Sequence, residues 1–255
     1  ERLREEEVRN LGMKHALKEA ELAALQSRVN PHFLFNTLNA GVQLAMFEGA
    51  DRTGRFMGEL SSLLRYNLRH LDQPVSLADE FGICRIYVSL LGIRFGDRIR
   101  YEERLEEACL GLAVPCMILQ PLVENAFIHG LEPKPAGGTI SVSASRAGPD
   151  EDRYVLVRVS DDGVGMDADT LERLRRWDDT PADQPGGSPV PGSPAPGASR
   201  GHTTGIGLGN VRDRLRHHYG RDDVLRVESG PGGTAVTIMF HERRPADAEQ
   251  IAGLR

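Results

Sequence analysis

The sequence predicts an α+β protein in two parts, a helical hairpin over residues 1–72 followed by a mixed α/β domain over residues 73–241. Three observations carry this prediction. Before residue 72, apolar residues recur at helical spacing, most clearly at Phe56, Leu60, Leu63, Leu64 and Leu68. The pair Gln73-Pro74 then marks a boundary. Beyond it, helical segments are interspersed with segments in which every second residue is apolar, such as Val155, Val157 and Val159.

The first part reads as one long helix over residues 1–48 and a second helix from about Arg52 to Leu71. The first helix mixes both charge signs at its start and carries a sparse apolar stripe, which fits a solvated coiled coil that needs a partner. Two helices bury too little surface to be stable alone. We therefore expect a homodimer in which two hairpins form a four-helix bundle.

In the second part, we expect helices over residues 77–95, 115–129, 168–177 and 206–218, and strands over residues 99–105, 139–145, 154–160, 224–228 and 234–240. Residues 178–203 are dense in Pro, Gly, Ser and Ala. This composition cannot build a core, so it predicts a mobile loop. Residues 242–255 are expected to form a frayed tail.

Composition argues against several classes of function. The net charge of −6 offers no general basic surface, so nucleic acid is not expected as a direct partner. Cys84, Cys109 and Cys116 form no CxxC pair, which predicts buried thiols in a reducing compartment. No run approaches the roughly 18 apolar residues of a membrane-spanning helix. Because the chain begins at Glu1 and lacks an initiator methionine, we expect it to be a piece of a longer protein.

The first motif of chemical interest surrounds His32, where residues 28–39 read RVNPHFLFNTLN. A lone histidine on an apolar helix is most often a packed residue. Pro31 favours a special role, because proline inside a helix costs about 3 kcal/mol, although a helix that starts at Pro31 would avoid that cost. Asn36 lies one turn later and could hold the imidazole in one tautomer, whose neutral nitrogen is a competent nucleophile.

The helical phase of His32 raises a difficulty. In an undisturbed helix, His32 shares a stripe with Leu25 and Val29, whereas a reactive imidazole must face water. Either Pro31 shifts the phase or this stripe is not the buried seam.

The second motif is LQPLVENAFIHG at residues 119–130. A helix here could direct the amide oxygen of Asn125 toward Mg²⁺, a cation that prefers oxygen ligands. Glu124 could supply a second oxygen or accept a proton, and His129 and Gly130 would end the helix beside phosphates. An ordinary amphipathic helix that begins near Pro115 and ends at Gly130 explains the same residues equally well.

Two glycine-rich motifs follow, VSDDGVGM at residues 159–166 and TTGIGLGN at residues 203–210. Glycines ahead of a helix expose N–H groups that bind anionic oxygens. The second motif lacks the GK[ST] ending of a Walker A loop, and no strand leads directly into it as in a Rossmann fingerprint. Taken alone, the Asp-Asp-Gly of the first motif is also a common strand-ending turn.

Together these motifs resemble a known family, the LytS-type bacterial sensor histidine kinases. Residues 28–39 resemble the family's phosphoacceptor box, and residues 119–130, 159–166 and 203–210 resemble its N, G1 and G2 boxes. The boxes occur in the family's order, and the resemblance runs from about Ala24 to Phe240. It implies a dimerisation hairpin followed by a Bergerat-type α/β sandwich that binds ATP, as in the GHKL superfamily.

The resemblance implies a role for each matching residue. His32 would be the phosphoacceptor, oriented by Asn36, with Glu124 as a candidate base. Asp161 would accept a hydrogen bond from the adenine amino group, supported from behind by Thr234. The full set expected to bind ATP is Asn125, His129, Gly130, Asp161, Gly163, Gly165, Thr204, Gly205, Gly207, Leu208, Gly209, Asn210 and Thr234, with Asn125 also holding Mg²⁺ through the phosphates. Residues 178–203 stand where the superfamily keeps its ATP lid, with an apparent insert.

Two positions depart from the family's pattern. The family usually has Asn at the position of Asp162, so an added negative charge is expected near the metal and phosphates, where it could assist Mg²⁺ or weaken ATP binding. Many histidine kinases carry an acid directly after the phosphoacceptor, where this chain has Phe33. The proton acceptor therefore stays open between Glu124 and water.

The implied function is the core of a two-component sensor histidine kinase, which phosphorylates His32 from ATP and passes the phosphoryl group to an aspartate of a response regulator. By family resemblance the regulator often carries a LytTR-type DNA-binding domain, and the chain would be the cytoplasmic portion of a membrane protein. One alternative is a gyrase-like or chaperone-like ATPase, but Pro121 occupies the position of the water-activating glutamate in those enzymes. The other is a non-catalytic dimerisation scaffold, against which the intact Asn125, Asp161 and glycines argue.

Overall fold

The computed structural model describes residues 31–69, 73–148, 154–175, 206–221 and 224–241. The chain divides after Leu68 into two compact units, and each is described by itself. The coiled coil expected before residue 31, the loop expected at residues 178–203 and the tail at residues 242–255 lie outside the described residues. Among the described helices, none has both the length and the apolar character needed to cross a membrane.

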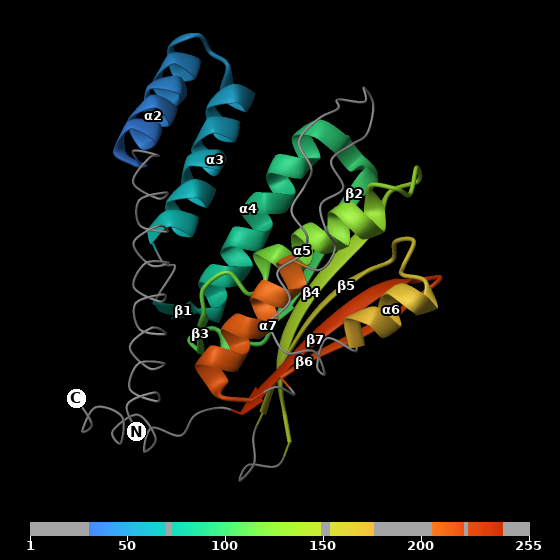
Figure 1. Ribbon diagram of the computed structural model, residues 1–255. Coiled ribbons are helices and arrows are strands. Elements are labelled where there is room, and N and C mark those ends of the chain that lie inside the picture. The colour runs from blue at the N-terminus through green and yellow to red at the C-terminus, as the bar shows by residue number, and fades with distance from the viewer. Residues whose placement is uncertain (1–30, 70–72, 149–153, 176–205, 222–223, 242–255) are drawn as a thin grey trace, which may run out of the picture. The chain divides into compact units, whose positions relative to one another are not determined.

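The first unit is a helical hairpin of α2 (Pro31–Phe47) and α3 (Asp51–Arg69) (Figure 1). Gly49 adopts a φ of +66° at the turn between the helices, a conformation that glycine reaches at no steric cost. Leu38, Ala45 and Leu63 are buried, but a larger set of apolar side chains stays exposed: Phe33, Leu44, Met46, Phe47 and Leu68. Phe47 is 90% exposed, so this hairpin leaves much apolar surface in contact with water.

The second unit is built on a five-stranded sheet with the order β2-β4-β5-β7-β6. The strands are β2 (Ile99–Leu105), β4 (Gly138–Ala147), β5 (Tyr154–Asp161), β6 (Leu225–Gly230) and β7 (Gly233–His241). β2 pairs parallel with β4, and every other neighbouring pair is antiparallel. A helical region followed by a mixed α/β sheet domain confirms the predicted fold class.

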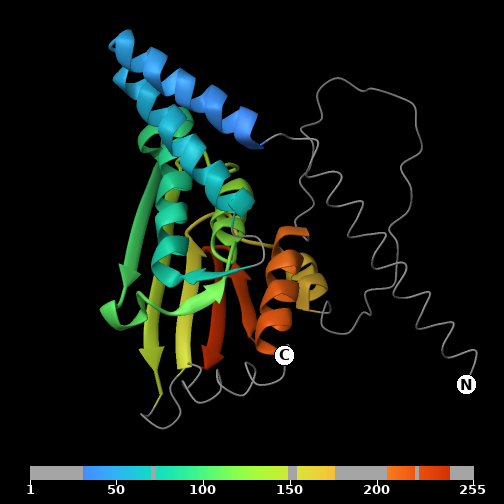
Figure 2. The same ribbon diagram turned by 90° about the vertical axis from the view of Figure 1, so that its left-hand side faces the viewer.

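Three helices cover one face of this sheet: α4 (Leu77–Phe95), α5 (Gln120–Asn125) and α7 (Ile206–Tyr219) (Figures 1 and 2). A short helix, α6 (Ala168–Arg175), contacts β6. Because side chains alternate along a strand, the covered face of the sheet is apolar and forms the core. Its members include Ile140, Val142, Val155, Val157, Val159, Ile238 and Phe240. Cys84, Cys109 and Cys116 are all buried, as predicted.

Helix α4 begins with a capping box. The Ser76 hydroxyl accepts a hydrogen bond from the Asp79 amide at 3.1 Å, and the Asp79 carboxylate accepts one from the Ser76 amide at 3.3 Å. These bonds satisfy two backbone donors that would otherwise lack partners, a contribution of about 1 kcal/mol. Gly96 ends the helix with a φ of +60°.

The helix predicted over residues 115–129 is wrong at its start, and its second half is π-helical. Its first residue belongs to β3 (Ala113–Pro115), which pairs antiparallel with β1 (Pro74–Ser76), and neither of these three-residue strands was predicted. The helix starts only at Gln120, because the preceding amides bond to the side chain of Glu80 in α4. After Asn125 the backbone continues as a π-helical turn, η3 (Ala126–Leu131). Such turns occur often at functional sites.

Candidate functional site

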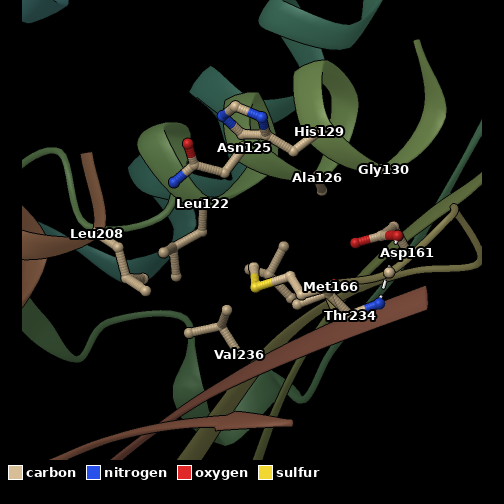
Figure 3. Close-up of a pocket in the computed structure, with 12 residues that line it drawn as sticks. Leu122, Asn125, Ala126, His129, Gly130, Asp161, Met166, Leu208, Thr234 and Val236 are labelled. Atoms are coloured by element: carbon tan, nitrogen blue, oxygen red, sulfur yellow. Dashed lines mark hydrogen bonds between the residues drawn. The ribbon is translucent and has the colours of Figure 1, made fainter. Parts of the chain in front are cut away.

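A pocket in the second unit collects side chains from segments that lie far apart in the sequence (Figure 3). Helix α5 and the η3 turn form one wall, the strands β5 and β7 form the other, and the start of α7 contributes Leu208. The lining residues are Leu122, Asn125, Ala126, His129, Gly130, Val159, Asp161, Gly165, Met166, Leu208, Thr234 and Val236. Most of these side chains are apolar, so the few polar groups would determine how a ligand is oriented.

Asp161, at the end of β5, is the carboxylate of this pocket. Its Oδ1 accepts a hydrogen bond from the Gly163 amide at 2.8 Å. It accepts a second one from the Thr234 amide at 3.4 Å, which Figure 3 shows as a dashed line. Within the described part of the chain, no residue donates to Oδ2, which is therefore the oxygen available to a ligand N–H. Burial raises the pKa of Asp161, and the two amide bonds oppose that rise.

Glycines surround Asp161 closely. A Cβ atom on Gly130 would lie 2.5 Å from Asp161 Oδ1, and one on Gly163 would lie 2.3 Å from the carbonyl carbon of Gly130. Gly233, with a φ of +120°, brings the start of β7 close to the end of β5. A Cβ atom added to Gly233 would lie 2.0 Å from the Asp161 carbonyl oxygen. Only residues without a side chain allow η3, β5 and β7 to meet here.

The opposite wall presents the side chains of Asn125 and His129. Asn125 is the last residue of α5, and His129 follows one turn later in η3. Figure 3 shows both side chains on the same wall, across the pocket from Val236. A Cβ atom on Gly207 would lie 3.3 Å from Asn125 Nδ2, so the first turn of α7 packs directly against this amide.

Asp162 does not line the pocket. Its Oδ1 accepts hydrogen bonds from the Thr139 amide at 3.0 Å and from Lys134 Nζ at 3.3 Å. Slight burial alone would raise the pKa of Asp162, but the Thr139 amide and the Lys134 ammonium together hold it below its ordinary value. The sequence led us to expect the Asp162 carboxylate beside the phosphates, but in the structure this carboxylate pairs with Lys134 outside the pocket.

The structure brings together seven of the predicted ATP-binding residues in the pocket lining: Asn125, His129, Gly130, Asp161, Gly165, Leu208 and Thr234. The Gly163 amide donates a hydrogen bond to Asp161, and Gly207 packs against Asn125. Asn210 instead lines a separate surface hollow with Arg214 and His217, because it projects from another side of α7. Gly209, also in α7, is half-buried, and Thr204 and Gly205 lie outside the described residues.

Glu124, the candidate base, is half-buried on α5 and is not among the lining residues of the pocket. Burial, followed by the nearby carboxylates of Glu124 and Glu132, raises the pKa of Tyr87 in α4. Glu124 therefore lies near Tyr87 of α4, a helix that packs against α5. Its role as a base stays a prediction.

Sequence reasoning missed the apolar lining residues Leu122, Ala126, Val159, Met166 and Val236. Leu122, Ala126, Val159 and Val236 are buried on α5, η3 and the strands like any core residue, and Met166 follows β5 in a loop. Nothing in that pattern separates a side chain that faces a pocket from one that packs against another element.

His32 belongs to the first unit, where its side chain is exposed. Leu25 and Val29, which define the apolar stripe expected to include His32, lie outside the described residues. Asn36 Nδ2 lies 3.3 Å from His32 Nδ1 and 3.4 Å from Nε2. Because the two distances are nearly equal, this contact holds the ring near Asn36 but does not by itself select one ring nitrogen.

No group of three or more His, Cys, Asp or Glu side chains in the described residues could hold a metal ion. A cation at this pocket would therefore depend on few protein ligands and on oxygens of the bound ligand, which is how Mg²⁺ usually accompanies phosphates.

Two families match this chain. Residues 20–99 match the family described as histidine kinase, and residues 115–244 match the family described as histidine kinase-, DNA gyrase B-, and HSP90-like ATPase. The first match contains His32, and the second contains every residue that lines the pocket.

Individual relatives agree with these matches. The chain is 30% identical to sensor histidine kinase YpdA of Escherichia coli over 248 residues, which are 97% of this chain and 38% of YpdA. It is 30% identical to sensor histidine kinase YesM of Bacillus subtilis and 28% identical to sensor protein LytS of Staphylococcus epidermidis, in each case over 88% of this chain and 34% of the relative. These matches confirm the resemblance predicted from the motifs. The chain spans little more than a third of the length of these relatives.

Proposed function

Because the chain belongs to the histidine kinase-, DNA gyrase B-, and HSP90-like ATPase family, we propose that it is the catalytic core of a sensor histidine kinase that uses ATP to phosphorylate its own His32. The observation that carries this proposal is the pocket, in which one buried carboxylate, one amide and a glycine-bounded apolar lining converge. The phosphoryl group would then pass to an aspartate of a response regulator.

The pocket fits a purine. Asp161 would accept a hydrogen bond from the adenine amino group through Oδ2, while the amides of Gly163 and Thr234 keep Oδ1 in place. Met166 and the apolar side chains around it would contact the faces of the ring, and a thioether packs well against an aromatic system. Adenine would thus be recognised by one polar contact in an apolar pocket.

The phosphates would lie toward Asn125 and the start of α7. Asn125 would offer its amide oxygen to Mg²⁺, and the exposed N–H groups at the α7 N-terminus, near Gly207, would bind phosphate oxygens. Bound ATP with Mg²⁺ would supply the phosphoryl group. The protein contributes mainly positioning and charge neutralisation, as is general for phosphoryl transfer.

His32 would accept the phosphoryl group through a ring nitrogen. Its exposed position and the Asn36 contact are compatible with this role. Phe33 follows it in the chain, so the ring proton would leave to Glu124 or to water.

The exposed apolar side chains of the hairpin would be covered in a homodimer. The further expectations are a regulator that carries a LytTR-type domain and a place in the cytoplasmic portion of a membrane protein. Both rest on the family resemblance.

A hydrolytic ATPase is the second candidate, since the family includes such enzymes. Hydrolysis needs a group that activates water, and the resemblance places that group at position 121, where this chain has Pro121, the second residue of α5. Proline has no side chain that can accept a proton, so transfer to a protein nucleophile is favoured.

Incubation of the whole chain with γ-labelled ATP and Mg²⁺ tests the proposal. We expect acid-labile label on the wild type and on His217→Gln, an exposed histidine of α7 that serves as the matched control, but none on His32→Gln. Rapid release of free phosphate without protein label would instead identify an ATPase. If the protein takes up no label and releases no phosphate, only the non-catalytic dimerisation scaffold remains as an interpretation.

A further inference from the structure

Glu80 is a buried carboxylate that lies outside the pocket. Its side chain is 1% exposed in the first turn of α4. Oε1 accepts a hydrogen bond from the Met117 amide at 2.7 Å, and Oε2 accepts bonds from the amides of Ile118 at 2.9 Å and Leu119 at 2.8 Å. A carboxylate is costly to bury unless its oxygens are well bonded, and here three backbone N–H groups meet that need.

These three amides lead directly into α5. The first N–H groups of a helix have no partner within the helix and usually bond to a capping side chain. Leu119, at the N-cap position of α5, has no side chain that can do this. Glu80, in a different helix, supplies an acceptor for the Leu119 amide and also accepts bonds from the amides of Met117 and Ile118, which precede α5.

The backbone at this point is held in an unfavourable conformation. Met117 has a φ of +60° and is the one non-glycine residue with positive φ in the described part of the chain. An L-residue keeps such a conformation only where its surroundings determine it. The short bond from the Met117 amide to Glu80 is one such restraint.

A second restraint acts on the same segment from α7. Arg214 donates a hydrogen bond to the carbonyl oxygen of Cys116, the residue before Met117. The same helix packs Gly207 against Asn125 and lines the pocket with Leu208. Residues 116–119 are therefore tied to α4 and α7 at once, and α5 continues from them to the pocket.

We infer that Glu80 is a positioning residue for the nucleotide site, fixing where α5 begins and hence where Asn125 stands relative to Gly207. Helix α5 has only six residues, so its own hydrogen bonds resist displacement poorly and its position depends on how its ends are held. The inference rests on the proposed function only in naming the ligand as a nucleotide.

The carboxylate is needed for its charge and for its acceptors. Glutamine has nearly the same shape but a single acceptor oxygen, and its amino group would face at least one backbone N–H. Glu80→Gln therefore leaves a buried donor without an acceptor at the start of α5.

The test compares Glu80→Gln with Asp79→Asn in the whole chain. Asp79 is the adjacent residue in the same helical turn, and its substitution weakens the capping box without touching residues 117–119. Well below the unfolding temperature, we expect Glu80→Gln to weaken binding of Mg²⁺-ATP by at least about tenfold, the lower end of the loss typical when a supporting partner of a site ligand is removed. The control should change the affinity less than about twofold, because exposed substitutions away from a site have small effects.

Amide hydrogen exchange gives a second readout, which does not depend on ATP. Exchange at residues 117–119 should accelerate in Glu80→Gln and remain as in the wild type in Asp79→Asn. Wild-type affinity in Glu80→Gln, or equal losses in both variants, would overturn the inference. If the wild type itself fails to bind ATP, the proposed function fails, while the exchange comparison still tests the contact.

If Glu80→Gln does not fold, Arg214→Gln tests the same segment from α7. It removes the bond to the Cys116 carbonyl and leaves Glu80 intact. Several-fold weaker ATP binding is expected, and an unchanged affinity in this variant would overturn the inference as well.

Discussion

Asp161 and Asp162 are adjacent in the sequence but lie in opposite electrostatic environments. Asp161 is removed from water beside the pocket, which raises its pKa even though two backbone amides bond to it. Asp162 is exposed and bonds to Thr139 and Lys134, which lower its pKa. The effect of replacing Asp162 can therefore serve as the reference for the effect of replacing Asp161.

Replacing Asp161 with Asn should remove a pH-dependent contribution to the stability of the wild type. A carboxyl whose folded-state pKa is raised favours folding below its unfolded pKa, and this contribution is lost as pH rises through the folded pKa. We therefore expect the free energy of unfolding of Asp161→Asn, relative to wild type, to increase between about pH 3 and pH 7, the range in which carboxyls titrate. Urea unfolding at a series of pH values measures this difference.

Asp162→Asn is the matched control and should behave in the opposite way. Its lowered pKa stabilises the wild type above the unfolded pKa, and this contribution disappears as pH falls. At pH 7 the variant should be less stable by under about 1 kcal/mol, since the Lys134 pair is partly exposed. The same sign of pH dependence in both variants would contradict the two environments described.

Much of the candidate site was predictable at the residue scale, because Asp161 and the glycines stand in recognisable motifs. Glu80 was not. Its neighbours in the sequence suggest only the start of a helix, and its partners are backbone amides that the fold brings to it. No side-chain pattern records a contact with a backbone 37 or more residues away.

At the scale of elements, the predicted bounds of α4 and β2 agree with the structure, and those of β4, β5, β6 and β7 differ by no more than two residues at an end. Ser76 and Gly96 mark the ends of α4 by their own chemistry, so its limits are local. The start of α5 is not local. Pro115 suggested a helix start, but β3 and Glu80 hold residues 113–119 in another conformation, so tertiary contacts override the local signal.

Because η3 and the segment that follows β5 are in close contact, adding one methyl group at Gly163 should destabilise the protein. In Gly163→Ala, the new Cβ would meet the Gly130 backbone at 2.3 Å, so one of the two segments must move. We expect a loss of about 1–3 kcal/mol in the free energy of unfolding, typical of overpacking. ATP affinity should fall with it, because the Gly163 amide holds Asp161.

Gly92→Ala is the control for that substitution. Gly92 lies within α4 and has open space where a Cβ would stand, so alanine should stabilise the protein by about 0.5–1 kcal/mol. Urea unfolding compares the two variants. A Gly163→Ala protein as stable as Gly92→Ala would show that η3 and β5 are not in close contact.

At the scale of the whole molecule, all residues that line the pocket belong to the second unit, whereas His32 belongs to the first. Binding of nucleotide should therefore stabilise the two units unequally. A ligand at 100 times its dissociation constant adds about 2.7 kcal/mol to the stability of the state that binds it. For a domain of this size, that corresponds to a rise in Tm of about 5–10 °C.

We expect Mg²⁺-ATP to produce this rise in calorimetry for the wild type and not for Asp161→Asn. Hydrogen exchange should show where the gain lies, with added protection in α5, β5 and β7 and little in α2 and α3. Equal protection of all these elements would contradict a site confined to the second unit.

The strand order also bears on how the protein is synthesised. β7 inserts between β5 and β6 and is the last described strand to leave the ribosome, and it brings Thr234 beside Asp161. Until β7 has been translated, β5 lacks one neighbour and the Asp161 carboxylate lacks one of its two amide donors. Under the proposed function, a polypeptide released before β7 would keep His32 but lack Thr234 and Val236 of the pocket, so the phosphate donor would have to be held by a complete second chain.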